Sequence, residues 1–418
     1  MAWKKRGLGL AIAMATIAGE AQAGGLERSG YNIDLLFDPA DYVFEAATDA
    51  VMPRRRLKDV VDTDPSDGLG SDGIGGGATR ADDTESYFSP RIGFKAAIGP
   101  DVDCMADYSQ PWGAHLDPGR DWVGANSNIE TKIVSDAYAL TCSYGVDVGQ
   151  GVLKLIGGGS YQTIDGYKEQ FVAPVPGGGV GRIDLSGSGW GWRAGIAYEI
   201  PDYAFRASLV YNNEIDLGEM TGEIDLTQIP KALNPANPTL GVVSPIYGTA
   251  TIPSALEFKL QTGIAPDWLV FGSVKWTDWS VIQSLPFCPV ATKGLAACVP
   301  GSPAVATSFD LLYRDGWEIG GGIGHRFNDQ WAGAVGVTWD RGTSTGVGTS
   351  SDTWTLTSGV SYKPTPKLEV VFAGTLGLLT SGSSSSKVQD GITYGDDISY
   401  RYGTDVVGAL STSLKVRF

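Results

Sequence analysis

The chain has 418 residues, 42% of them hydrophobic, and a formal net charge of −16. So acidic a protein is a poor candidate for binding nucleic acid, whose phosphates need basic partners. The 58 glycines, 17 tyrosines and 12 tryptophans are typical of a β-rich chain, either a large soluble protein or a barrel wetted by lipid on its outside.

The N-terminus predicts a secretory signal peptide over residues 1–23. A basic run at residues 4–6 precedes an apolar stretch, and Ala21-Gln22-Ala23 supplies the small residues of a cleavage site. The next segment, residues 24–40, precedes any strand pattern and is long enough to thread into a barrel lumen as a short plug, or hatch. A disordered terminus is the alternative for this segment.

Alternating apolar and polar residues mark the rest of the chain. The pattern is clearest at 189–200 and 203–216, which flank a turn at Pro201-Asp202. Trp190 belongs to the apolar face of the first strand and Arg193 to its polar face. Such alternation indicates a strand with one apolar face, and each arm is long enough for a tilted strand to cross a bilayer.

Repetition of this pattern predicts an all-β fold, a transmembrane antiparallel β-barrel of about 14 strands over residues 41–418 with the short N-terminal plug inside. The predicted strands are 42–53, 87–98, 102–113, 134–147, 150–164, 189–200, 203–216, 255–265, 268–283, 314–326, 331–342, 353–363, 367–380 and 406–418. Short turns and long loops alternate between them, as in outer-membrane barrels with periplasmic turns and external loops. A soluble sandwich has no reason to alternate loop lengths, so the pattern favours a multi-pass protein of the cell outer membrane.

The final strand and the first long loop each suggest a partner. The last strand alternates and ends on Phe418, which resembles the signal that the barrel assembly machinery reads. The loop at 54–86 begins with basic residues at 54–58. These predict contact with the phosphates of lipopolysaccharide or other outer-membrane lipid, although such runs are more often simply solvated. We expect a monomer.

Four cysteines fit an oxidising compartment. Cys288 and Cys298 share one external loop and are predicted to form a disulfide that closes about ten residues of chain. Cys104 and Cys142 fall at the same level of neighbouring strands, on matching faces. They are either bridged or a pair of lipid-facing thiols, and both alternatives stay open. No spacing is typical of a zinc site, and we expect neither a metal nor a cofactor.

The sequence offers little material for catalysis. Its two histidines, His115 and His325, are predicted at opposite ends of the barrel wall. A hydrolase needs its nucleophile and base within hydrogen-bond reach of each other, so we do not expect an enzyme.

Several segments carry a family likeness. These are GWGWRAGIAYEI with the strand after it (189–216), a strand, turn and strand at 256–282, the run starting YRDGW (313–340), and SQPWG at 109–113. In this order and spacing they resemble the FadL-type family of outer-membrane transporters for long-chain fatty acids and hydrocarbons. The resemblance spreads over most of the chain from about residue 87.

The resemblance implies a 14-stranded barrel and passive uptake of hydrophobic molecules through an apolar lumen site gated by the N-terminal hatch, with release partly sideways through a gap in the wall. An apolar site inside a plugged barrel lets an oily solute exchange one apolar environment for another at little cost. Residues 24–40 are shorter than the family's hatch, and Phe37-Asp38-Pro39-Ala40 is the nearest trace of its Asn-Pro-Ala segment.

A fatty-acid carboxylate requires a basic group at the end of an apolar pocket. By resemblance, Arg314 matches the basic position of the family's (K/R)DA motif, and Lys168 a basic position after strand five. By strand parity, Lys275 faces the lumen with Leu269 and Phe271. Further candidates are Arg193, Arg206 and Arg326 by parity, and Ile33, Leu36 and Phe37 of the hatch as apolar lining. The simpler alternative for each basic residue is an ion pair with a lumen carboxylate.

Two other functions fit a barrel of this kind. An aqueous general or specific porin predicts an open polar lumen and steady conductance. A structural or adhesion barrel acting through its acidic loops predicts no uptake phenotype on deletion.

Overall fold

The computed structural model describes residues 25–63, 68–70, 77–175 and 179–418. The signal peptide predicted over residues 1–23 lies outside the described residues. Among the residues described, no helix combines the length and the hydrophobicity that a membrane crossing requires.

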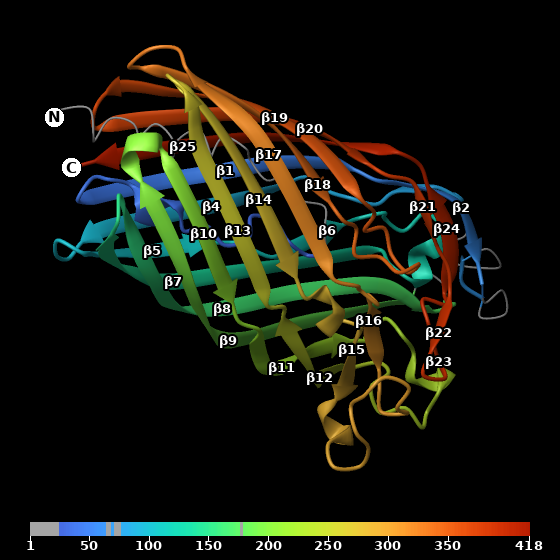
Figure 1. The fold of residues 1–418 in the computed structure, drawn as a ribbon. Helices are drawn as coiled ribbons and strands as arrows, with labels where there is room; N and C mark the ends of the chain where they lie inside the picture. Colours follow the sequence, from blue (N-terminus) through green and yellow to red (C-terminus); the bar gives the residue numbers. More distant parts are fainter. Residues whose placement is uncertain (1–24, 64–67, 71–76, 176–178) are drawn as a thin grey trace.

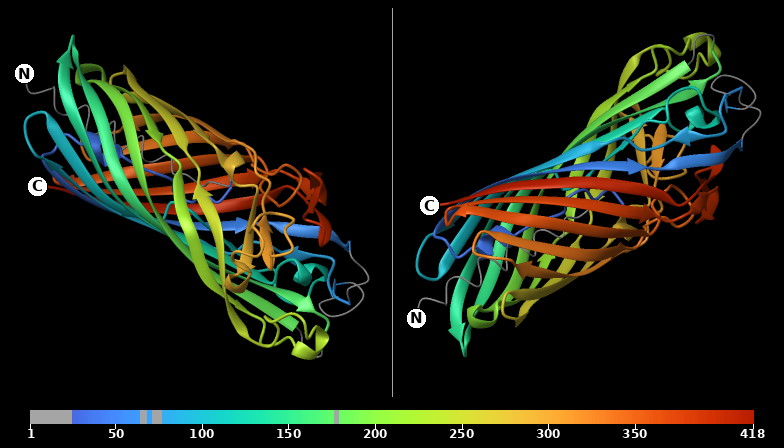
Figure 2. Two further views of the ribbon diagram at one scale, coloured as in Figure 1. Left: turned by 90° about the horizontal axis from the view of Figure 1, so that it is seen from below. Right: turned by 90° about the horizontal axis from the view of Figure 1, so that it is seen from above.

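The strands wind into a closed antiparallel barrel (Figure 1; Figure 2). Strand β1 (Tyr42–Arg54) pairs with β4 (Tyr87–Ala97) on one side and with the final strand β25 (Asp405–Arg417) on the other, so the two ends of the sheet meet. Closure pairs the first and last strands of the wall with each other, and paired edges are what a β-sheet needs in order to lie in lipid. The predicted all-β barrel of 14 strands is therefore confirmed.

The described residues supply fourteen strand positions, some of them broken in two. Between β4 and β25 they are β5 (Val102–Ser109) with β6 (Gly113–Leu116), β7 (Glu130–Val148), β8 (Gly151–Ala173), β9 (Gly179–Ile200), β10 (Phe205–Asn212) with β11 (Ile215–Asp225), β12 (Val243–Ile252) with β13 (Ala255–Ala265), β14 (Trp268–Thr277), β17 (Gly316–Arg326), β18 (Trp331–Asp340), β19 (Thr353–Thr365) and β20 (Leu368–Leu379). Short helical turns lie at η4 (Pro201–Tyr203), η5 (Lys231–Leu233) and η7 (Val290–Thr292).

Two predicted strands differ from the structure in ways that matter for the lumen. The strand expected at 102–113 is interrupted at 110–112, where Pro111 has no N–H to give to a ladder. The strand expected at 268–283 ends at Thr277 and is followed by the turn η6 (Trp279–Val281). After it, β15 (Ser284–Pro289) pairs with β16 (Thr307–Asp310). These breaks let Trp112 and Trp279 turn inward, where both are 2% exposed.

The wall separates lipid from lumen as the alternation predicts. Trp190 is 76% exposed and Leu410 is 62% exposed on the outside of the barrel. Their strand neighbours of opposite parity, Arg193 and Lys415, are buried. Inward side chains are therefore polar or small where outward ones are apolar.

External loops cover the end of the barrel away from the C-terminus (Figure 1). A small sheet of β21 (Gly382–Ser384), β24 (Ile398–Tyr402), β2 (Arg56–Asp62) and β3 (Ala81–Asp82) lies there with η3 (Val123–Asn126) and the hairpin of β22 (Lys387–Gln389) and β23 (Ile392–Tyr394). We call this layer the outer cap.

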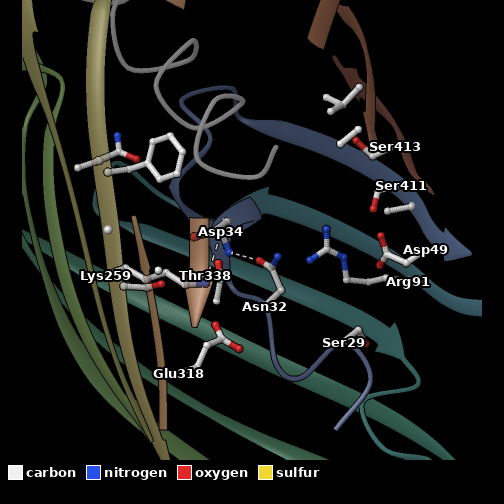
Figure 3. Close-up of a pocket in the computed structure, with 18 of the residues that line it drawn as sticks. Ser29, Asn32, Asp34, Asp49, Arg91, Lys259, Glu318, Thr338, Ser411 and Ser413 are labelled. Carbon is white, nitrogen blue, oxygen red and sulfur yellow. Dashed lines mark hydrogen bonds and ion pairs between the residues drawn. The ribbon is translucent and has the colours of Figure 1, made fainter. Parts of the chain in front are cut away.

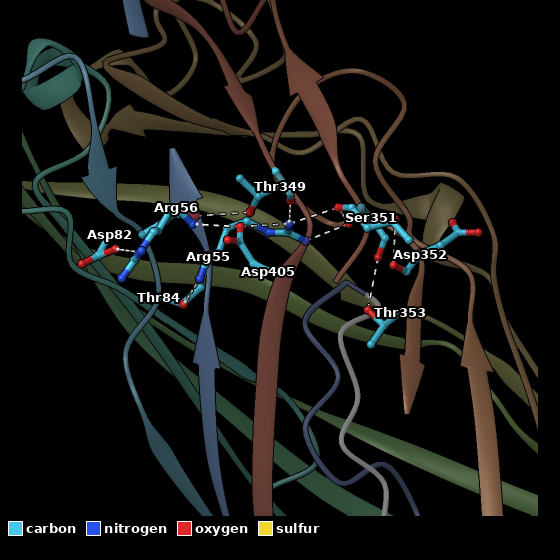
Figure 4. A network of polar contacts seen from close by, with 12 residues as sticks. Arg55, Arg56, Asp82, Thr84, Thr349, Ser351, Asp352, Thr353 and Asp405 are labelled. Atoms are coloured by element: carbon cyan, nitrogen blue, oxygen red, sulfur yellow. Dashed lines mark hydrogen bonds and ion pairs between the residues drawn. The ribbon is translucent and has the colours of Figure 1, made fainter. Parts of the chain in front are cut away.

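Arg55 ties the outer cap to the wall (Figure 4). Its guanidinium donates hydrogen bonds to the Thr380 carbonyl at 3.1 Å, the Gly403 carbonyl at 3.2 Å and the Ser351 hydroxyl at 2.7 Å. It also lies 3.5 Å from the Asp405 carboxylate. One buried cation thus joins several loops that are far apart in the sequence.

Candidate functional site

Residues 25–40, the described part of the predicted plug, pack against and bond to several strands of the wall, and we call this segment the hatch. Its 3₁₀ turn η1 (Asp34–Phe37) is amphipathic. Leu36 and Phe37 are 0% and 1% exposed, and with Ile33 they pack against β5, β8, β9 and β10 through Met105, Ile156, Ala197 and Val210. The polar side chains of Asn32 and Asp34 line a cavity on the other side.

The hatch is fixed to the wall at both ends. The Arg28 N–H donates to the Pro111 carbonyl at 2.8 Å, and the Gly113 N–H donates to the Leu26 carbonyl at 2.7 Å. The hatch backbone therefore occupies the break between β5 and β6. At the other end, Arg417 lies 2.8 Å from the carboxylate of Asp38.

Lys275, predicted to face the lumen, forms an ion pair with Glu27 of the hatch. Both side chains are almost fully buried, at 8% and 7% exposure. Two buried charges this close neutralise each other, and removing either leaves the other without compensation. Lys275 therefore acts as an anchor for the hatch.

Aromatic side chains form a continuous apolar cluster towards the outer end of the lumen. Tyr31 of the hatch meets Trp112 edge to face at 5.6 Å, Trp112 meets Trp279 at 5.6 Å, and Trp279 meets Tyr313 at 5.8 Å. Gly25 completes the packing: its φ is +59°, and a Cβ there would lie 2.6 Å from the Trp279 ring. Only glycine fits this position without strain.

Aliphatic residues from the strand extensions surround these rings, and we call the whole group the outer apolar cluster. It includes Ile183, Leu185, Ile215, Leu217, Met220, Ile224, Leu226, Ile246, Ile252, Ile282 and Phe287, with Phe309 and Leu311 packed against it. Because a lumen open to water does not favour so much apolar surface, this cluster is the strongest candidate for contact with an oily ligand.

Few polar groups border the outer apolar cluster. Gln162 accepts a hydrogen bond from the Trp112 indole N–H at 3.1 Å and donates one to the Tyr31 hydroxyl at 2.6 Å. The Lys168 ammonium lies 5.5 Å from the centre of the Phe309 ring. The structure thus places a cation, predicted from the sequence, beside a side chain that packs on the cluster.

A cavity with a largely polar lining lies deeper in the lumen (Figure 3). This cavity of about 150 Å³ separates the hatch from the opposite wall. Its charged lining comprises Arg91, Arg206, Lys259, Asp34, Glu45, Asp49 and Glu318, and its apolar lining includes Phe271, Val371 and Ala373. We call it the mid-lumen cavity.

Buried charges dominate the periplasmic half of the lumen. Lys154 lies 3.2 Å from Glu199, Lys95 lies 2.7 Å from Asp103, and Arg417 lies 2.6 Å from Glu369. Among the described residues, the outer half of the lumen holds the larger apolar cluster, whereas the inner half combines these ion pairs with the smaller apolar groups around Phe37 and Leu269. Fixed pairs of this kind resist hydration because each charge already has its partner.

The remaining predicted site residues take up different positions. Leu269 is 2% exposed and packs with Val371 and Ala373, next to Phe271, which lines the mid-lumen cavity. Arg314 lies on the external rim with 42% of its side chain exposed, donating to the Gly342 carbonyl at 3.0 Å and lying 3.8 Å from Asp352.

Several side chains of the outer apolar cluster and the mid-lumen cavity are not predicted as site residues by the sequence. Tyr313, next to Arg314, enters the outer apolar cluster and is 8% exposed. Trp112 and Trp279 follow breaks in the strand pattern, where parity no longer predicts a side chain's direction. Lys259 and Asp34 were also missed, although Lys259 shares inward parity with Gln261 on β13, a signal that was available.

Both cysteine pairs are disulfides. Cys288 is joined to Cys298 across a sequence separation of 10. Cys104 is joined to Cys142 from directly opposite positions on β5 and β7. The histidines lie apart: His115 contacts Glu130 at 3.2 Å beside the external loops, and His325 contacts the carbonyl of Asp267 at a short turn.

Comparison with known proteins agrees with this architecture. Residues 82–417 match the family model described as outer membrane protein transport protein (OMPP1/FadL/TodX). A long-chain fatty acid transport protein of Salmonella typhi is 28% identical over 37% of this chain, and one of Escherichia coli strain K12 is 26% identical over 37%. These matches span about a third of the relatives' own length, 34% and 33%.

Solved structures share the fold. A Pseudomonas aeruginosa FadL homologue superimposes with a TM-score of 0.75 at 16% identity, covering 99% of this chain and 98% of its own. The Ralstonia pickettii toluene transporter TbuX gives 0.60 at 16% identity, covering 92% and 91%. The family match over most of the chain and the closed barrel together make this a multi-pass outer-membrane protein that belongs to the OMPP1/FadL/TodX family of transport proteins.

Proposed function

We propose that the protein carries long-chain fatty acids or related hydrophobic compounds passively across the outer membrane, and that the outer apolar cluster is where the ligand's hydrocarbon part binds. The observation that carries this proposal is the buried aromatic line from Tyr31 to Tyr313, built partly from the hatch. The matched relatives are long-chain fatty acid transport proteins, which supports the same substrate class.

The outer apolar cluster lets a hydrocarbon chain move from one apolar environment to another. A hydrocarbon chain that leaves the lipid or a detergent-like aggregate stays out of water when it enters apolar side chains, so little free energy is lost. Lys168 provides a cation close to the outer apolar cluster. A fatty acid can therefore place its carboxylate near Lys168 and its tail against the rings.

The hatch serves as the gate in this proposal. Its backbone occupies the break between β5 and β6, and Glu27 pairs with Lys275. A ligand that displaces Tyr31 from the aromatic line would loosen this segment and open the way inward. The break at 110–112 also offers a sideways exit once the hatch backbone has left it.

Uptake by the purified mature protein in liposomes tests the proposal. We expect labelled oleate to enter protein-containing vesicles faster than protein-free ones, and native mass spectrometry to detect co-bound lipid. An Arg314→Ala variant should retain uptake, because Arg314 is on the rim, whereas Lys168→Gln should reduce it. Steady open conductance in planar bilayers without oleate uptake would favour the porin alternative and contradict the proposal.

We also propose that the outer face of β1 contacts lipopolysaccharide phosphates. Arg54 has the same parity as the exposed Met52, and Arg56 and Lys58 continue this line on β2, where Lys58 lies opposite Arg401. Like charges placed opposite each other are unfavourable unless an anion lies between them. Charge-removing variants at Arg54 and Lys58 should lose lipopolysaccharide from the purified protein.

A further inference from the structure

Asp34 of the hatch presents its carboxylate to cations of the barrel wall at the mid-lumen cavity (Figure 3). Its Oδ1 atom lies 3.5 Å from a guanidinium nitrogen of Arg206, and its Oδ2 atom lies 3.6 Å from the ammonium of Lys259. Arg91 lines the same cavity from β4. The wall therefore offers a recess with three cations that a carboxylate from the N-terminal segment occupies. Lys259 also pairs with Glu257 at 3.3 Å and Arg91 with Glu45 at 3.6 Å.

The fit between Asp34 and this recess is loose. Both ion-pair distances exceed the 2.7–2.9 Å of a strong charge-assisted hydrogen bond. Arg206 is 4% exposed, and its Nη1 atom has no hydrogen-bond partner among the described residues. A buried guanidinium with an unused donor is costly to keep, and a carboxylate with freer geometry would satisfy it better than one fixed to the backbone.

We propose that this recess is a second binding station for the carboxylate of the transported ligand, and that Asp34 is a built-in substitute which holds it when no ligand is present. The inference rests on the proposed function, because it assumes that an amphiphile reaches the lumen. The inference narrows the proposed substrates to long-chain carboxylates in preference to uncharged hydrocarbons. It also identifies Asp34 as a residue that competes with the ligand carboxylate.

Exchange of one carboxylate for another makes the step feasible. If Asp34 simply withdrew, Lys259 would keep its ion pair with Glu257 at 3.3 Å, whereas the buried Arg206 would lose the carboxylate that offsets its charge and keep a hydrogen bond to Gln261. A ligand carboxylate that takes its place keeps the local charge unchanged. An uncharged hydrocarbon cannot do this, so it does not release η1.

The lining beyond the cations suits a hydrocarbon tail. Phe271, Val371 and Ala373 border the mid-lumen cavity, and Leu269 packs with the last two. The cavity itself, about 150 Å³, is smaller than the roughly 300–1,000 Å³ of pockets for drug-sized ligands. A long-chain ligand therefore enters fully only as the hatch moves, which links binding at the recess to release of the hatch.

The test uses the full mature protein in lipid nanodiscs. Asp34→Asn removes the competing charge at nearly constant shape, and Asp49→Asn is the matched control, because Asp49 lines the same cavity on β1 but has no ion pair with Arg206 or Lys259 among those the structure gives. We expect Asp34→Asn to bind oleate about tenfold more tightly, with oleyl alcohol unaffected. Adding Arg206→Gln to Asp34→Asn should reverse the gain.

Hydrogen exchange of the η1 amides provides a local readout. Oleate should speed exchange at residues 34–37 of the wild type and oleyl alcohol should not, whereas Asp34→Asn should exchange quickly without ligand. Heat-modifiable migration in gels checks that each variant is a folded barrel. Equal effects of the acid and the alcohol, or unchanged oleate affinity in Asp34→Asn, would overturn the inference. A different result contradicts the proposed function itself: the wild-type protein takes up neither oleate nor oleyl alcohol.

Discussion

Trp112 and Trp279 meet edge to face inside the barrel, with ring centroids 5.6 Å apart and an interplanar angle of 89°. Each follows the point where a wall strand stops, one at the break after β5 and the other in η6 after β14. Two interruptions of the wall thus combine to build the centre of the outer apolar cluster.

Replacing Trp279 by alanine should weaken ligand binding. The change removes two aromatic contacts, with Trp112 and Tyr313, each worth about 0.5–1.5 kcal/mol beyond area burial. Those contacts contribute to folding stability. If the ligand packs on the same ring, the loss of one comparable contact should raise its dissociation constant about 2- to 13-fold. Trp190→Ala is the matched control, because Trp190 is 76% exposed to the lipid side. Equal losses in the two variants would contradict a role for the cluster.

Breaking the Glu27–Lys275 ion pair should release the hatch. Lys275→Gln leaves the Glu27 carboxylate buried without its partner, which costs roughly 3–5 kcal/mol in comparable buried pairs. We expect faster hydrogen exchange at residues 26–31 and larger conductance in planar bilayers. The double variant Glu27→Gln with Lys275→Gln should recover much of the protection, and failure to recover it would mean that the pair does not hold the hatch.

Reducing the external disulfide should free the loop between β15 and β16. Cys288 is fully buried next to Phe287 of the outer apolar cluster, so the bond to Cys298 holds the loop against the cluster. Closing a loop of this size contributes about 2–3 kcal/mol by chain entropy. Cys288→Ser with Cys298→Ser should make residues 290–306 sensitive to protease on intact cells. Cys104→Ala with Cys142→Ala, in the wall, should leave that loop resistant.

The outer cap should be less stable at neutral pH than in mild acid. Burial raises the pKa of Asp83 from 3.8 to about 6, and the hydrogen bond from Thr349 and the charge of Arg55 only partly oppose this. The closed cap therefore binds the proton more tightly than the open one. Its stability is greatest below about pH 4, falls as the pH rises to about 6, and is constant above that, a change of roughly 3 kcal/mol.

Hydrogen exchange across the outer cap between pH 4 and 7 measures this dependence. Asp83→Asn, which stays neutral, should keep the cap closed at pH 7 and abolish the pH dependence. Asp82→Asn is the control, since the Asp82 side chain is 79% exposed in its ion pair with Arg56. A cap whose opening has the same pH profile in wild type and Asp83→Asn would exclude Asp83 as the titrating group.

The sequence by itself determined the barrel, the approximate positions of most of its strands and, where the alternation is unbroken, which side chains face inward. Alternation has a period of two residues and is set locally, so Leu269, Phe271 and Arg206 were assigned to the inside without knowing their neighbours. The even number of strands and the alternating loop lengths followed from the same local pattern.

Only the tertiary structure decided what meets inside. The hatch has no periodicity, and contacts with the finished wall select its path: Glu27 with Lys275, Asp34 with Arg206, and the backbone at Leu26 and Arg28 with the break before β6. Barrel closure brings these partners together from distant strands. Where the alternation stops, at Trp112 and Trp279, side-chain direction is fixed by long-range packing, and no local pattern contains that information.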